Sequence, residues 1–124
     1  MVKAMNYLKI TLLLVFLSGC RSRNDVTLEI NNSSQVNFDS AVGLVNDHKF
    51  LIKTIEPGKI ITLNIPISSI KLNGHDFMLH LNLFSKNLKD TLTGMFYTDL
   101  GGNPGRKYLI DISAKKEVGI AVEY

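Results

Sequence analysis

The stretch Val26-Thr27-Leu28-Glu29-Ile30-Asn31 decides the fold class, because apolar and polar residues alternate strictly along it. Side chains of a β-strand point alternately to opposite faces, so a period of two is typical of a strand with one face buried and the other in solvent. An amphipathic helix would repeat its apolar residues every three or four positions, and the chain has no convincing repeat of that kind. The sequence therefore predicts β-structure.

Alternating runs continue to the end of the chain, and turn-forming residues separate them at intervals of about 8 to 12 residues. At Glu56-Pro57-Gly58-Lys59, for example, proline fixes φ and glycine permits a positive φ, so the chain can reverse. The expected strands cover residues 26–31, 36–44, 50–55, 60–65, 76–85, 91–98, 108–112 and 118–124, and residues 67–72 form a short strand or a linker. The pattern predicts an all-β protein: a single antiparallel β-sandwich of seven to eight strands, immunoglobulin-like or transthyretin-like.

Individual residues within these runs carry finer predictions. Gly43 lies inside a strand and predicts a bulge or a close approach, and Pro66 lacks a ladder donor and predicts an edge strand. In the run 76–85, the alternation turns Phe77, Leu79, Leu81 and either Leu83 or Phe84 inward, and Met78, His80 and Asn82 outward.

The beginning of the chain has a different pattern. Lys3 and Lys9 accompany an apolar run over residues 10–17, and small residues follow, which is the order of a secretory signal peptide. The run is shorter than the roughly 20 apolar residues that a membrane-spanning helix needs. It ends in Leu17-Ser18-Gly19-Cys20, which resembles the lipobox of bacterial lipoproteins. The alternative is an ordinary cysteine that follows an ordinary signal peptide.

The resemblance implies a division of the chain into three parts. Residues 1–19 would be a signal peptide cleaved between Gly19 and Cys20, residues 20–25 the lipidated cysteine and a polar tether, and residues 26–124 the sandwich domain. A diacylglycerol on Cys20, and often a further acyl chain, would anchor the protein in the bacterial cell envelope. In enteric lipoproteins an Asp after the cysteine favours the inner membrane; here the residue is Arg21, which favours the outer membrane.

Composition narrows the classes of function. Without residues 1–19 the chain keeps 105 residues, enough for one domain, with 12 basic and 11 acidic residues and a net charge of +1. This balance argues against nucleic acid as a partner. Cys20 is the only cysteine, so an internal disulfide is excluded and an apolar core must stabilise the domain.

The most loop-like stretch lies near the C-terminus, at 99–105, and it is the predicted binding site because loops on a rigid sandwich commonly carry function. The residues predicted to bind are Tyr97, Asp99, Gly101, Gly102, Asn103 and Tyr108. We expect no metal there, because calcium sites gather several carboxylates and this loop has one. His48, His75 and His80 are expected to be solvated, since residues 75 and 80 would lie on opposite faces of a strand.

No sequence motif for catalysis occurs: the chain lacks a nucleophile elbow, a phosphate-binding loop and a zinc-protease helix. We therefore expect a lipid-anchored envelope protein that is not an enzyme, uses no cofactor and binds another envelope protein. One alternative is a lipoprotein that binds a small ligand or a carbohydrate, with Tyr97 and Tyr108 stacking on a sugar, although the absence of Trp argues against it. A lipid-tethered hydrolase would need paired carboxylates, and the candidates are Asp39, Asp47, Asp76, Asp90, Asp99, Asp111 and Glu117.

Overall fold

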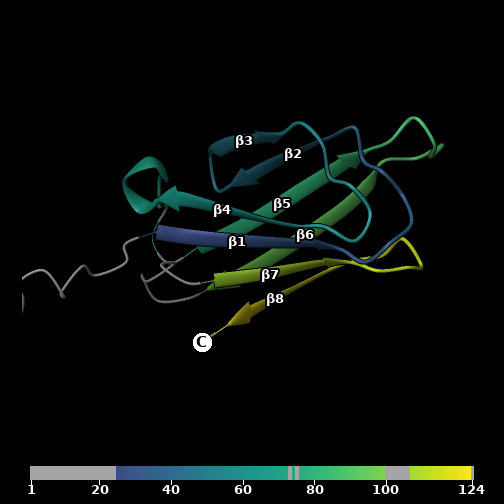
Figure 1. Cartoon of the computed structure of the whole chain (residues 1–124). Helices are drawn as coiled ribbons and strands as arrows, with labels where there is room; N and C mark the ends of the chain where they lie inside the picture. The colour runs from purple at the N-terminus through teal and green to yellow at the C-terminus, as the bar shows by residue number, and fades with distance from the viewer. Residues whose placement is uncertain (1–24, 73, 75, 100–106, 124) are drawn as a thin grey trace, which may run out of the picture.

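A computed structural model describes residues 25–72, 74, 76–99 and 107–123. These residues form two four-stranded sheets packed face to face, with no α-helix among them (Figure 1). Sheet I has the strand order β4-β1-β7-β8, and sheet II has the order β3-β2-β5-β6. The strands are β1 (Asp25–Asn32), β2 (Ser40–Val45), β3 (His48–Ile52), β4 (Ile60–Pro66), β5 (Asp76–Phe84), β6 (Leu92–Asp99), β7 (Lys107–Ile112) and β8 (Val118–Glu123). The predicted all-β sandwich is confirmed, with eight strands.

Strand pairing is antiparallel except between β1 and β7, which run side by side in parallel with Thr27 opposite Lys107. The predicted antiparallel sandwich thus contains one parallel pair. Short turns impose antiparallel pairing only on strands that follow each other in the chain. β1 and β7 are far apart in sequence, so packing of the whole domain decides their relative direction.

The core lies between the sheets and takes every second residue of most strands. Val26, Leu28 and Ile30 of β1 are fully buried, as the alternation predicts. Tyr108 of β7 stands at the centre: its ring stacks on Phe77 at a centroid distance of 4.7 Å and meets Phe96 edge-on at 5.7 Å. Aromatic pairs in these geometries stabilise a core beyond the area that they bury.

A buried polar network shapes the connection from β1 to β2. The Asn32 side chain donates to the backbone oxygens of Val36 (2.8 Å) and Ile55 (3.2 Å), and its oxygen accepts from the Ser34 hydroxyl (2.6 Å). Phe38 then forms an isolated bridge with Ile55. Because these bonds fix the segment in a non-strand path, β2 begins at Ser40 and not at residue 36 as predicted.

The other local predictions have mixed outcomes. Pro66 does end an edge strand, since β4 is the outer strand of sheet I, and the chain then turns through a short 3₁₀ segment, Ile67–Ser69. Gly43 marks a close approach, because a Cβ there would overlap the ring of Phe50. At the end of β5, Leu83 points inward and Phe84 outward.

Candidate functional site

The outer face of sheet II is unusually apolar for a surface that faces solvent. The side chains that point outward are those that alternate with the buried residues of each strand. The register aligns these outward side chains in rows across the four strands. We call the following six residues the apolar face: Val42 and Leu44 of β2, Leu51 of β3, Met78 of β5, and Met95 and Tyr97 of β6. Outward positions on a solvated antiparallel sheet are normally polar.

Three members of the apolar face are largely in solvent. Leu51 is 62% exposed, Met95 65% and Tyr97 61%. Scattered exposed apolar residues are common, but a contiguous group on one sheet marks an interaction site. The polar residues among them are the outward Lys49 and His80 and the pair in which Thr93 donates to Asn82 at 2.9 Å.

One end of the apolar face carries carboxylates and a pocket of about 320 Å³ lined by Asn46, Asp47, Asp76, Met78 and Tyr97. The Tyr97 hydroxyl donates to Asp76 at 2.7 Å, and Asp76 lies opposite Asp99 in the ladder between β5 and β6. Two effects of Asp76 raise the pKa of Tyr97 above the ordinary value of 10.0. The larger is the hydrogen bond from the Tyr97 hydroxyl to the carboxylate, and the second is the negative charge of that carboxylate.

The tight turn between β2 and β3 builds this end. Asn46 adopts a positive φ of 51°, as hairpin turns require, and its side chain accepts from the Met78 backbone at 2.8 Å. Asp47 accepts from the Lys71 backbone at 2.9 Å. We call this the acidic end: it carries Asp47, Asp76 and Asp99.

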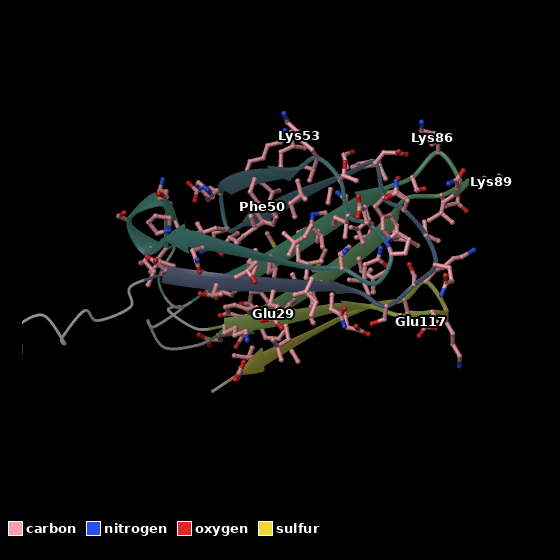
Figure 2. All side chains as sticks on the ribbon, viewed as in Figure 1. Glu29, Phe50, Lys53, Lys86, Lys89 and Glu117 are labelled. Carbon is pink, nitrogen blue, oxygen red and sulfur yellow. The ribbon has the colours of Figure 1, made fainter. Side chains whose placement is uncertain are left out.

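The opposite end of the same face carries lysines. Lys53 follows β3, and Lys86 and Lys89 lie in the connection from β5 to β6 (Figure 2). Asp39 and Asp90 are also at this end, and Asp39 accepts from the backbone nitrogen of Lys86 at 2.8 Å. We call it the basic end. Sheet II therefore presents an apolar centre between regions of opposite charge.

The outer face of sheet I has a charged cluster whose members pair with one another. Lys107 bridges Glu29 at 2.8 Å and Glu123 at 3.3 Å across three adjacent strands. These two carboxylates raise the pKa of Lys107, chiefly through the hydrogen bond to Glu29. Thr27 donates to Asn64 at 2.9 Å in the same region. These outward polar groups thus bind one another, and Ile60 at the start of β4 is a large apolar residue that this face exposes.

The structure separates the residues that the sequence predicted to bind. Tyr97 is exposed and lines the pocket, and Asp99 ends β6 beside it. Tyr108, in contrast, is fully buried between Phe77 and Phe96, so the prediction that it stacks on a ligand is wrong. It alternates inward in β7, next to Ile110, as a core residue does. Gly19, Cys20, Gly101, Gly102 and Asn103 lie outside the described residues.

Sequence reasoning missed Leu51 and Met95. The sequence did carry a signal for Met95. In the run 91–98, Thr93, Met95 and Tyr97 share one face, and two of these three are apolar. The opposite face is largely apolar as well. A strand that is apolar on both sides predicts that both sides are covered.

Three further findings concern the described part of the chain. Among those residues, no three His, Cys, Asp or Glu side chains are grouped so that they could hold a metal ion. The same residues include no helix long and apolar enough to cross a bilayer. The pocket at the acidic end brings Asp47 and Asp76 together, but both carboxylates are exposed and each accepts the hydrogen bond described above.

Comparison with known proteins supports the fold. No family model and no curated protein matches the chain. Among solved structures, the chain is similar to a protein from Eubacterium rectale determined by NMR, with a TM-score of 0.53 and 13% sequence identity over 82% of this chain and 91% of that chain. At this identity, the likeness shows a shared sandwich architecture.

Proposed function

We propose that this protein is a lipid-anchored, non-catalytic interaction module of the bacterial cell envelope, and that it binds a protein partner through the apolar face of sheet II. The observation that carries the proposal is the exposure of Leu51, Met95 and Tyr97 on one regular sheet. Protein interfaces combine an apolar centre, often with Met and Tyr, with a polar rim. The apolar face between its acidic and basic ends has this composition.

The apolar face lies on a rigid part of the sheet, which favours binding of a partner over catalysis. Met95 and Tyr97 stand on β6, which pairs along its length with β5, and the side chains beneath these strands are packed core residues. A preformed surface loses little conformational freedom when a partner docks. Catalysis would instead require grouped nucleophiles or bases held in a site that excludes water.

The anchor is proposed from the resemblance of Leu17-Ser18-Gly19-Cys20 to a lipobox. β1 begins at Asp25, so four residues, 21–24, lie between the lipidated cysteine and the sandwich. Even fully extended, the five steps from residue 20 to residue 25 span only about 17 Å. The domain would therefore stay close to the membrane surface, where it would meet other anchored or integral envelope proteins.

A second candidate is recognition of a small cationic ligand in the pocket at the acidic end. Tyr97 offers an aromatic surface there, and Asp47 and Asp76 offer negative charge. Cations bind favourably to such a combination. For a carbohydrate, the pocket has Tyr97 as an aromatic platform but not Tyr108, because Tyr108 is buried.

Photocrosslinking in intact cells tests the docking face. A photoreactive phenylalanine analogue would replace Met95, and in a matched control it would replace Ile60, which is 61% exposed on sheet I. We expect a discrete protein adduct from position 95 and none from position 60. Equal adducts from both positions, or none from position 95, would contradict the proposed function.

Metabolic labelling with a fatty-acid analogue tests the anchor. The full-length protein should incorporate the label and remain with membranes, whereas Cys20→Ala should do neither. Labelling that persists in Cys20→Ala would refute lipidation at this residue.

A further inference from the structure

We infer that the partner of the apolar face is a second copy of this chain, packed face to face and turned end for end. The inference rests on the proposed function, because it names the occupant of the same face. Its basis is the separation of charge along sheet II. The acidic end and the basic end lie on opposite sides of one apolar centre, so a second copy supplies the complement of each.

The register places the charges at comparable distances from the centre. The middle row runs from Lys49 through Leu44 and His80 to Met95. Asp76 and Asp99 lie two rows from it on one side, and Phe84 lies two rows away on the other side, next to the loop that carries Lys86 and Lys89. When one copy is reversed along the strand direction, its lysines lie over the partner's carboxylates at both ends.

Two symmetric arrangements are possible when two such faces pack together, and the charges distinguish them. A twofold axis across the strands reverses the second copy and joins acidic ends to basic ends, and it brings Lys49 over its own copy only at the β3 edge of the sheet. A twofold axis along the strands joins acidic end to acidic end, which is repulsive. Closed dimers are self-complementary in this way, so an interface with one acidic and one basic end favours the first arrangement.

The size of the face indicates a weak dimer. Strands about 4.8 Å apart, with about 3.3 Å per residue, give four strands of this length a footprint on the order of 300 to 400 Å². Stable complexes bury about 800 Å² on each partner. Anchoring both copies to one membrane would raise their effective concentration, which compensates for a small interface. The domain therefore should associate on membranes much more readily than in dilute solution.

Cysteine crosslinking in membranes tests both the occupant and its orientation. Cys20 is the only native cysteine, and in the proposed mature protein its thiol carries lipid, so one introduced cysteine reports one position. Turned end for end, β6 lies on the partner's β6 in the middle row, and Met95→Cys should crosslink to itself with a short bismaleimide. Ile60→Cys on sheet I is the matched control and should stay monomeric.

Each result of this experiment has a definite meaning. A band at twice the mass from Met95→Cys, absent from Ile60→Cys, supports the inference. A crosslink that forms only between Met95→Cys and Lys49→Cys chains indicates the other arrangement and overturns the inferred orientation. An adduct with a different protein overturns the second copy as partner but supports the proposed function. Monomer alone, here and in the photocrosslinking experiment, overturns both.

Charge exchange tests the role of the two ends in the Met95→Cys background. One variant carries Asp76→Lys and Asp99→Lys, and the other carries Lys86→Asp and Lys89→Asp. Alone, each variant should lose at least five-fold in crosslinking yield, because like charges then meet at both junctions. A mixture of the two differently tagged variants should recover the yield.

The matched control for the charge exchange lies on sheet I. Thr62→Lys with Asn64→Lys adds charge to exposed outward positions and should leave the yield unchanged. Moderate salt should lower the yield of the native pair, because it screens exposed charges. Yields that are insensitive to the charge exchange would overturn the end-for-end arrangement.

Discussion

The outer faces of the two sheets share a strand geometry but differ in chemistry. On sheet I, Lys107 is held between Glu29 and Glu123, and neighbouring side chains donate to one another across the strands. On sheet II, the corresponding outward positions hold Leu51 and Met95, each more than 60% exposed. Sheet I pairs most of its outward polar groups within the molecule and exposes Ile60 at one edge, whereas sheet II exposes Leu51, Met95 and Tyr97 together.

In this sandwich the outward positions, and not the inward ones, carry the functional information. Both sheets bury an apolar inner face, so inward alternation carries no functional information. Outward positions contribute little to stability, and their chemistry can therefore follow the demands of binding. The contrast also supplies controls, because a substitution at an exposed outward position of sheet I can be compared with the same substitution at an equally exposed position of sheet II.

The largest expected effect comes from truncating a central side chain of the core between the two sheets. Tyr108→Ala deletes the ring that stacks on Phe77 and meets Phe96. Large-to-small aromatic substitutions in a core destabilise by about 3 to 5 kcal/mol, so this variant should be largely unfolded at moderate temperature. Urea unfolding followed by circular dichroism measures the loss. A loss below about 1 kcal/mol would mean that Tyr108 is not a central core residue.

A smaller loss is expected where the two sheets approach each other. A Cβ on Gly94 of β6 would overlap the side chain of Val118 at the start of β8. Gly94→Ala should therefore push β6 and β8 apart and destabilise by about 1 to 3 kcal/mol, the usual effect of overpacking. Gly119→Ala is the control, because a Cβ there meets nothing within 4 Å. Equal loss from both variants would contradict the close approach.

Making sheet II resemble sheet I should leave stability almost unchanged. Leu51→Thr with Met95→Thr replaces two exposed apolar side chains by residues that suit strands. The free energy of unfolding should change by no more than about 0.5 kcal/mol for each substitution. Binding of a hydrophobic fluorescent dye should fall, and Ile60→Thr on sheet I should change it less. Unfolding of the double variant would show that the apolar face is structural.

The charge bridge on sheet I should contribute modestly and lose its effect in alkali. Glu29 and Glu123 raise the pKa of Lys107, so the protonated lysine favours the folded state. The contribution is complete below the ordinary lysine pKa of 10.5 and is lost as the pH rises through the raised pKa. Lys107→Met should lower Tm slightly at pH 7. The difference from the native protein should disappear in strong alkali and shrink in high salt.

The smallest effect concerns the titration of Tyr97 on sheet II. Its hydrogen bond to Asp76 raises the pKa of Tyr97, so the midpoint of its ionisation should lie above pH 10.0, and the associated stability is lost as the pH rises through the raised value. Asp76→Asn should move the tyrosine absorbance change to lower pH. An unchanged titration would refute the contact between these two side chains.

The local structure could be predicted from the sequence alone. Strict alternation identified the strand at 26–31, and the outward positions of Met78, His80 and Asn82 followed from the same period. Pro66 predicted an edge strand because it lacks a backbone N–H donor. Gly43 predicted a close approach because it lacks a Cβ. Both effects act on immediate neighbours. Alternation is a property of a single strand, and a strand carries it wherever the fold places that strand.

Which strands meet and which faces remain exposed depended on the packing of the whole domain. The parallel pair of β1 and β7, the burial of Tyr108 between two other rings and the union of Leu51, Met95 and Tyr97 on one surface all join residues far apart in the chain. A period of two assigns a side chain to one of two faces, but it does not reveal whether water or another sheet lies beyond that face. Tyr97 and Tyr108 show this: both alternate within β-strands, and packing places one at the surface and the other in the core.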